Sequence, residues 1–195
     1  MDYHRLHTTP GADSTLCILE RSPEGTERNG YKLADGEAIG SAYPASPNWD
    51  MSKDFPGLKV ASLVDSTARF LVVRGDLKDV IAATGVPLEA LPFVLVDHKG
   101  RVASRDHFIV NVLGTRDCLN LDRSDIKWST EVPGAVVRVK KLVLDPKKLE
   151  GAPDIFRVRE DPPAIVVSDR LAARLRALTP SNLHLLRLDQ VAAGS

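Results

Sequence analysis

The sequence is poor in cysteine and has no long apolar run, and both absences limit what the protein can be. Its 195 residues include two cysteines, Cys17 and Cys118, which stand far apart. Such sparse use suits a reducing compartment, where a lone cysteine packs as a small apolar side chain. No stretch approaches the roughly 20 apolar residues of a membrane-spanning helix, and the start lacks the basic segment and apolar core of a signal peptide. We therefore expect a cytoplasmic protein without a disulfide.

Net charge is absent as well. Lys and Arg together number 26, as do Asp and Glu, so the formal net charge is zero at pH 7. A neutral chain has no overall field that attracts nucleic acid or an anionic membrane. The 43% of apolar and 27% of charged residues are ordinary for a globular protein. We expect neither nucleic acid nor a membrane as a direct partner.

The first 48 residues have the least regular pattern. Residues 14–20 alternate as a strand does, and a brief strand fits residues 31–33, but glycine, proline and charged residues dominate the rest. We expect residues 1–48 to be an irregular N-terminal segment, either packed on the main domain or added to it as an arm. Residues 49–195 are expected to form that main domain.

Clearer patterns begin at residue 70. Apolar stretches predict strands at residues 70–73, 91–97, 107–113, 135–145, 155–158 and 165–167, and amphipathic spacing predicts helices at 75–85 and 169–178. Several strands with few helices favour an α+β fold with a mixed or antiparallel sheet over a regular βα repeat.

Two strand–helix–strand stretches match each other at a spacing of 94 residues (165 minus 71). Leu77 then matches Leu171, and Ile81 matches Leu175. In the strand that follows, the same spacing matches Leu91 with Leu185. The matching positions are those that would face a core, so a weak internal duplication and convergent packing explain them equally well. In either case the two units frame the central strands.

Metal and phosphate motifs are incomplete. His4 and His7 are three residues apart, but no helical pattern and no carboxylate at ligand spacing accompany them. We expect two surface histidines, no metal site and no cofactor. Residues 25–32 have glycines spaced as in a phosphate-binding loop, but the lysine is one place late and no strand–loop–helix context surrounds them.

Catalytic residues are equally sparse. His107 and Asn111 could belong to a metal-dependent nuclease, but the apolar residues between them alternate as in a plain strand. The least implausible nucleophilic site combines Cys118, His107 and Asp122, although no glycine-framed turn presents the cysteine. We expect no enzyme.

Several residues suit contacts with a partner protein. Loop aromatics are either core residues or interface anchors, the acidic residues beside them suit a basic partner, and two arginines share one face of the helix at 169–178. The arginines fit a solvated face or a basic contact strip. The candidates are Trp49, Asp50, Asp54, Phe55, Trp128, Arg170 and Arg174. Glu160 and Asp161 make a further acidic strip.

Short segments follow one another in a characteristic order from about residue 49 to 188. The most specific are VNVL at 110–113, CLNLDRS at 118–124, IFR at 155–157 and VVSDRL at 166–171. In this order they resemble immunity family eleven of the bacterial polymorphic-toxin systems, which includes a myxobacterial immunity protein. The sequence departs from the family where it reads TPSNL in place of a glycine-containing turn, and RGDL where a serine is usual.

The resemblance implies a protein that binds a toxin encoded nearby and neutralises it by occlusion. Toxins of such systems are often nucleases. The resemblance implies neither an enzymatic activity nor a cofactor. Two other functions stay open, namely an enzyme that counteracts the chemistry of the toxin and a self-associating structural module. The sequence does not fix the oligomeric state.

Overall fold

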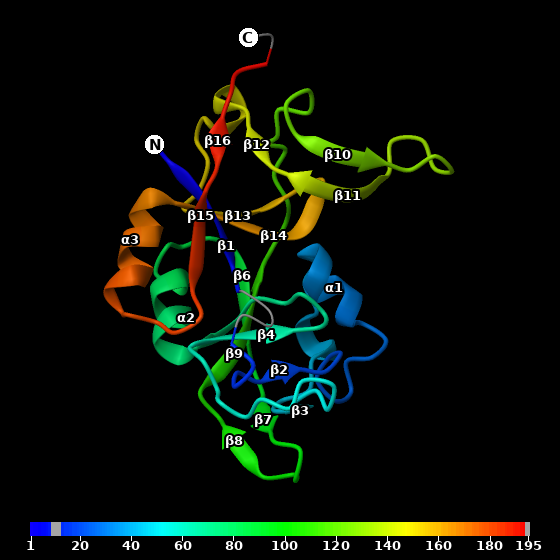
Figure 1. Cartoon of the computed structure of the whole chain (residues 1–195), viewed down its shortest axis with the longest axis vertical. Helices are drawn as coiled ribbons and strands as arrows, with labels where there is room; N and C mark the ends of the chain where they lie inside the picture. Colours follow the sequence, from blue (N-terminus) through cyan, green and yellow to red (C-terminus); the bar gives the residue numbers. More distant parts are fainter. Residues whose placement is uncertain (9–12, 194–195) are drawn as a thin grey trace.

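The computed structural model describes residues 1–8 and 13–193 and shows an α+β protein, as the sequence predicts (Figure 1). Within these residues the helices are α1 (Gly30–Asp35), α2 (Gly75–Ala82), α3 (Asp169–Ala177) and the 3₁₀ helices η1 (Gly40–Ala42) and η2 (Pro146–Leu149). The strands are β1 (Tyr3–His7), β2 (Ile18–Leu19), β3 (Asn48–Asp50), β4 (Leu63–Ser66), β5 (Val72–Arg74), β6 (Leu88–Pro92), β7 (Val94–Val96), β8 (Val102–Ser104), β9 (His107–Val112), β10 (Asp125–Trp128), β11 (Val136–Lys141), β12 (Val143–Leu144), β13 (Ile155–Val158), β14 (Asp161–Ser168), β15 (His184–Arg187) and β16 (Asp189–Gln190).

Two four-stranded units of the same topology build the centre of the molecule. The strand order is β4-β5-β9-β6 in the first, which β2 extends at its edge, and β13-β14-β1-β15 in the second. In each unit the strand before the helix and the strand after it both pair antiparallel with one strand between them. Helix α2 belongs to the first unit and α3 to the second, and the two helices contact each other (Figure 1).

The two units also agree in backbone conformation. Arg74 and Ser168 precede the helices with almost the same angles, φ −67° and ψ 157° against φ −67° and ψ 158°. After the helices, Gly85 and Thr179 both have a positive φ, 75° and 46°. Each pair is separated by the spacing of 94 (168 minus 74, 179 minus 85) that the sequence shows. This agreement favours a duplication over convergent packing.

The spacing changes by one residue in the strand after the helix. Val110 in β9 lies opposite Ala90, and Leu6 in β1 lies opposite Leu185. Because Val110 and Leu6 hold equivalent places in the middle strands, Ala90 corresponds to Leu185 at a spacing of 95 (185 minus 90). The expected match of Leu91 with Leu185 is therefore wrong, since the turn between helix and strand is one residue longer in the second unit.

The middle strand of the second unit comes from the start of the chain. Strand β1 lies between β14 and β15 and pairs with both. Residues 1–48 are thus not irregular throughout, because they contain β1, β2, α1 and η1. The sequence YHRLH has no β-branched residue, so β propensity does not mark this strand. Residues 31–33 lie in α1, and of residues 14–20 only two form a strand. The division of the chain at residue 48 stays a prediction.

Two predicted strands are each divided between sheets. Residues 91–97 contribute to β6, which pairs with β9, and to β7, which pairs with β3 and β8. Residues 135–145 divide at Leu142 into β11, which pairs with β10, and β12, which pairs with β16. Neither sequence marks the point at which the strand leaves one sheet for another.

Three apolar clusters hold the elements together. The first joins both units through α2 and α3, and its buried side chains include Leu77, Ile81, Leu171 and Leu175, as the matching positions predict. The second surrounds Trp49 and includes residues of β5, β7 and β9. The third lies beneath β10 and β11 and includes residues of β13 and β14.

Both cysteines are free and buried, in agreement with the sequence. Burial raises the pKa of the Cys17 thiol to about 11 and that of Cys118 to about 12, with nearby carboxylates adding to the rise at Cys118. Within residues 1–8 and 13–193, no helix is long and apolar enough to cross a membrane.

A buried arginine connects α1 with both units. The Arg157 side chain in β13 is buried, and its guanidinium donates to five oxygen atoms and forms no ion pair at hydrogen-bond distance with any residue that the structure describes. The acceptors are the carbonyls of Leu33, Ala34, Val112 and Pro162 and the Asn111 side chain. Burial lowers the pKa of Arg157 to about 10. Two of the most specific sequence segments, VNVL and IFR, therefore meet in the core.

Candidate functional site

The predicted partner-contacting residues lie in three separate places. The residues at positions 49–55 lie in β3 and in the turn that follows it. Trp128 is the last residue of β10 on a projecting hairpin, and the two arginines lie on α3 (Figure 1). The structure therefore does not unite them in one site.

Trp49 is a core residue. Its side chain is 1% exposed and packs against Phe93, with 5.0 Å between the ring centroids. The indole N–H donates to the Glu20 carbonyl at 2.7 Å. Of the two roles that the sequence leaves open for Trp49, core residue or interface anchor, the structure favours the first, because the tryptophan fills the second apolar cluster and its indole N–H has a hydrogen-bond partner there.

Asp50, Asp54 and Phe55 lie at the surface next to β3. Both aspartates are exposed, and Phe55 is 41% exposed. The backbone N–H of Asp54 donates to the Ser52 hydroxyl at 3.3 Å, which fixes the turn that carries these side chains. The three residues form a small surface that is open to a partner, and their role in binding stays a prediction.

Arg170 on α3 is bound within the protein. Its guanidinium donates to both carboxylate oxygens of Asp154, with Nη2 at 2.6 Å from Oδ2. The Ser168 hydroxyl donates to the same carboxylate. The hydrogen bond from Arg170, with that from Ser168, lowers the pKa of Asp154. Arg174 is exposed on the same helix. The predicted basic strip is thus partly neutralised by Asp154.

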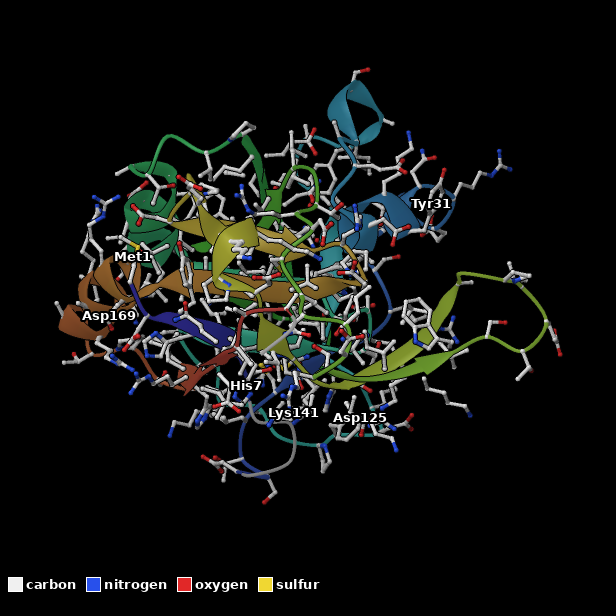
Figure 2. The ribbon with its side chains drawn as sticks, turned by 90° about the horizontal axis from the view of Figure 1, so that it is seen from above. Met1, His7, Tyr31, Asp125, Lys141 and Asp169 are labelled. Atoms are coloured by element: carbon white, nitrogen blue, oxygen red, sulfur yellow. The ribbon has the colours of Figure 1, made fainter. Side chains whose placement is uncertain are left out.

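Strands β10 and β11 form a hairpin that extends away from the body of the protein (Figures 1 and 2). Ile126, Val136 and Val139 anchor its base to the third apolar cluster. Trp128, the register partner of Val136, is nevertheless 43% exposed, and Val137 on β11 and Val132 in the hairpin turn are each 58% exposed. The projecting part therefore presents apolar side chains that its own fold does not cover.

Like charges face each other across this hairpin. Lys127 and Arg138 are register partners, and both are exposed. Lys140, also exposed, follows on β11. Within the described chain, neither an ion pair nor a side-chain hydrogen bond joins these three side chains to another group. Like charges directly opposite each other destabilise a strand pair, so the hairpin alone does not explain their placement.

A hollow of about 650 Å³ lies between the hairpin and the body. We call it the hairpin groove. Its lining residues are Arg5, Arg69, Val136, Val137, Arg138, Val139, Lys140, Glu160, Asp161 and Pro162. Four of these side chains are cationic and two are acidic, so the groove is basic although the whole chain is neutral.

One carboxylate holds two arginines at the floor of the hairpin groove. Arg69 Nη2 lies 3.1 Å from Asp161 Oδ1, and Arg5 Nη2 lies 3.7 Å from Asp161 Oδ2. The Asp161 side chain is 12% exposed, whereas that of Arg69 is 57% exposed. Arg69 has a φ of 60°, a conformation that is uncommon for residues other than glycine. The acidic strip predicted at residues 160 and 161 is therefore not a free acidic surface.

Glu160 is the second acidic residue of the groove. Its side chain is 8% exposed, and Oε1 lies 3.4 Å from Arg159 Nε. The other carboxylate oxygen, Oε2, is buried without a hydrogen-bond partner among the residues that the structure describes. A buried acceptor without a donor raises the free energy of the folded protein. This wall of the groove therefore contains a hydrogen-bond acceptor that a partner could satisfy.

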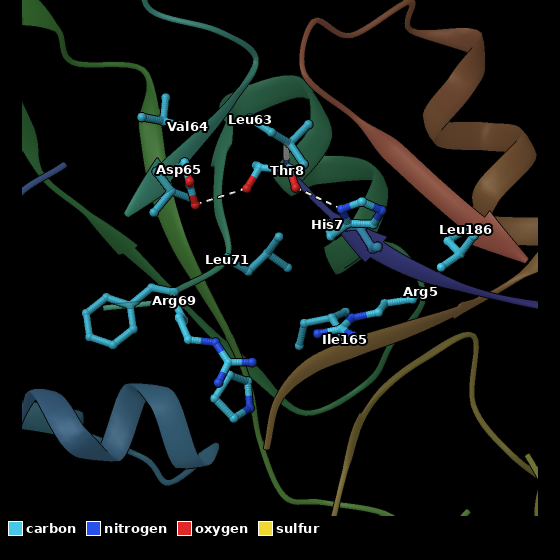
Figure 3. Close-up of a pocket in the computed structure, with 14 residues that line it drawn as sticks. Arg5, His7, Thr8, Leu63, Val64, Asp65, Arg69, Leu71, Ile165 and Leu186 are labelled. Atoms are coloured by element: carbon cyan, nitrogen blue, oxygen red, sulfur yellow. Dashed lines mark hydrogen bonds between the residues drawn. The ribbon is translucent and has the colours of Figure 1, made fainter. Parts of the chain in front are cut away.

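A second hollow of about 390 Å³ meets the hairpin groove at the arginine pair. Arg5 and Arg69 line both, and Figure 3 shows them on the side of the second hollow opposite Thr8 and Asp65. The Thr8 hydroxyl donates to Asp65 at 3.0 Å. Burial raises the pKa of Asp65. The base of this hollow is apolar, so its polar groups gather at one rim and at the arginine pair.

The residues of the alternative catalytic site do not interact. Cys118 is buried in the third apolar cluster, and Asp122 is exposed. His107 is buried in β9 and contacts the Ser104 hydroxyl and the Ala61 carbonyl, at 2.8 and 2.9 Å. The raised pKa of Cys118 disfavours its thiolate, the form that acts as a nucleophile.

The histidines of the N-terminus lie in a strand. His4 is buried in β1, with Nδ1 lacking a hydrogen-bond partner among the described residues, while His7 is half-buried. The prediction of two surface histidines is wrong for His4, because β1 is an inner strand. Among residues 1–8 and 13–193, no group of three His, Cys, Asp or Glu side chains could hold a metal ion.

The sequence did not identify the hairpin groove, although its alternating residues 136–141 predict a strand with cations at the surface. The groove forms from four segments that are distant in the sequence, namely β1, the β4–β5 turn, β11 and the start of β14 with the turn before it, and only the fold brings them together.

The comparison with family models assigns most of the chain. Residues 29–190 match the model described as Immunity protein family (Imm11). The match includes β10, β11 and the segments that meet at Arg157. The comparison with curated proteins finds no significant match.

Proposed function

The chain belongs to the Immunity protein family (Imm11), and on this premise we propose that it binds a cognate bacterial toxin and neutralises it by occlusion. The observation that carries the mechanism is the projecting hairpin. Its exposed Trp128 and Arg138 are residue types that are enriched among those that dominate binding energy at protein interfaces.

Binding rather than catalysis is the proposed mode of action. Cys118 is buried and disfavoured as a thiolate, and among the described residues the His107 ring forms hydrogen bonds with Ser104 and Ala61, not with Cys118 or Asp122. By contrast, the hairpin packs on the third apolar cluster through Ile126, Val136 and Val139 and exposes apolar side chains elsewhere. An anchored, exposed arm suits tight binding because little chain order has to be gained when the complex forms.

We propose a nuclease as the toxin and the cytoplasm as the place of neutralisation. A nucleic-acid groove is basic, so the basic hairpin does not suit it as a cover. The active centre of a metal-dependent nuclease is built from metal-binding carboxylates, which basic side chains complement. The proposed occlusion therefore takes place at or beside the catalytic centre.

The test is co-expression with the toxin encoded beside the gene, followed by size-exclusion chromatography and a titration of toxin activity. The proposal predicts a stoichiometric complex and complete loss of toxin activity at one equivalent. Cells protected from the toxin without any detectable complex would contradict it. They would favour an enzyme that counteracts the toxin.

Matched variants locate the face that binds. Trp128→Ala removes the anchor on the hairpin, and Phe55→Ala removes a similarly exposed aromatic residue next to β3. We expect the complex to be weakened by the first change and retained with the second. The reverse result would move the binding face to residues 50–55.

A further inference from the structure

The hairpin groove has a charge pattern that its own fold does not satisfy. Lys127 and Arg138 are opposite each other without a carboxylate, and Lys140 continues the basic row. Arg5 and Arg69 add two guanidinium groups at the floor and share a single aspartate. The cations thus outnumber the carboxylates that could neutralise them.

We infer that the hairpin groove binds an acidic, extended segment of the toxin, with carboxylates that contact Arg138 and Lys140 and reach the pair of Arg5 and Arg69. This inference rests on the proposed function, because it specifies the chemistry of the surface that the hairpin meets. Trp128 is exposed and follows Lys127, the register partner of Arg138, and in this inference it packs on apolar side chains of the same toxin segment.

A row of cations with a tryptophan could bind either of two anionic polymers, an acidic polypeptide or a nucleic acid. The groove also contains Glu160 and Asp161, and one oxygen of Glu160 has no donor in the described part of the chain. Carboxylates in the floor repel a phosphate backbone, whereas a polypeptide offers carboxylates to the cations and backbone N–H groups to the carboxylates. The mixed lining therefore fits a polypeptide better.

The size of the groove agrees with an extended segment. The hairpin groove of about 650 Å³ and the second hollow of about 390 Å³ meet at Arg5 and Arg69. A chain that follows both passes directly over the arginine pair. The arginine pair then exchanges part of its contact with Asp161 for a contact with the partner.

The closing experiment measures the affinity of the purified protein for the toxin encoded beside its gene, across a series of salt concentrations. The test variant is Arg138→Glu/Lys140→Glu. The control is Lys99→Glu/Arg105→Glu, which reverses two exposed charges next to β8, at the opposite end of the molecule (Figure 1). Thermal unfolding of both variants verifies that the fold is kept.

We expect the test variant to lose at least about tenfold in affinity at low salt and to lose most of the salt dependence, since rim charges act through long-range attraction. The control is expected to bind as the wild type does. Zero-length carbodiimide coupling of the wild-type complex is expected to join Lys140 to an Asp or Glu of the toxin.

The outcomes separate the two proposals. If the wild type binds the toxin and the test variant binds equally well, the groove inference fails and the proposed function stands. If the wild type does not bind the toxin, both fail. If the wild type binds a single-stranded oligonucleotide and the test variant does not, the groove belongs to nucleic acid and the inference is overturned.

Discussion

Arg157 Nη2 donates to the Asn111 side-chain oxygen at 3.2 Å, and this contact joins two of the sequence segments that most resemble the immunity family. The Asn111 amide nitrogen in turn donates to the Glu37 carbonyl and to Glu89, at 2.8 and 3.0 Å. Glu89 accepts from the backbone of Ile39. The contacts bind the N-terminal helix region to both four-stranded units. The most recognisable residues of the chain therefore maintain its architecture and are unavailable to a partner.

Replacing Arg157 by lysine tests this role. Lysine lacks the planar guanidinium that donates hydrogen bonds to five acceptors. Buried carbonyl groups therefore lose their donor, while a positive charge stays buried. We expect Arg157→Lys to lower the free energy of unfolding by about 3 kcal/mol or more, measured by urea denaturation. Arg159→Lys, at the exposed neighbouring position, is expected to change it by less than about 0.5 kcal/mol. Equal effects of the two changes would refute the role of Arg157.

Regular elements were predictable where periodicity is strong. The helices at residues 75–82 and 169–177, the strand at 107–112 and the repeated apolar positions follow from local pattern alone. The strand β1 was not predictable, because the partners that stabilise it lie more than 150 positions further along the chain and its own sequence lacks the apolar–polar alternation of a strand.

The candidate site was predictable only in part. Trp128 could be named from its polar surroundings, but the same reasoning selected Trp49, which is buried. Turn-rich sequence does not reveal whether a neighbouring sheet covers an aromatic ring. The arginine pair of Arg5 and Arg69 could not be found at all, because the two residues meet only through the pairing of β1 with β14 and their shared contact with Asp161.

The backbone of the turn after α3 is strained, as a comparison with the equivalent turn of the first unit indicates. Thr179 has a φ of 46° at the position that Gly85 occupies in the first unit, and a β-branched residue is disfavoured there. We expect Thr179→Gly to stabilise the protein by about 0.5–1 kcal/mol and Gly85→Ala to destabilise it by a similar amount. Both are measured by chemical denaturation. A destabilising effect of Thr179→Gly would contradict the equivalence of the two turns.

Stability is expected to fall in weakly acidic solution because of His107. Burial lowers its pKa below the ordinary 6.5, with Asp106, Asp76 and Arg74 as the charged groups nearby. The unfolded chain then takes up a proton near pH 6.5 and the folded protein only at lower pH. The stabilisation is therefore complete above pH 6.5 and is lost as the pH falls through the folded-state pKa.

The measurement is the free energy of unfolding at several values between pH 7 and pH 5. His107→Gln is expected to make the decline shallower, although not absent, because burial also lowers the pKa of His4. His184→Gln, at an exposed histidine, serves as the control and is expected to leave the slope unchanged. An unchanged slope in His107→Gln would exclude this origin.

Arg170 is expected to matter for stability and not for binding. Its exposed side chain forms a bidentate pair with Asp154, so Arg170→Ala is expected to lower the free energy of unfolding slightly, as measured by urea denaturation. The affinity for the toxin should stay at the wild-type value. A large loss of affinity in Arg170→Ala, with Arg174→Ala behaving alike, would restore the helical face of α3 as the binding surface.

The central claim is that the projecting hairpin binds the toxin, and the most direct test is the dissociation constant of the Trp128→Ala variant measured by calorimetry. Because Trp128 is 43% exposed, its removal is expected to leave the fold and thermal stability nearly unchanged. We expect Trp128→Ala to lose about 2 kcal/mol in binding free energy, roughly 30-fold in affinity. A Trp128→Ala variant that binds and inhibits the toxin as tightly as the wild type would contradict it.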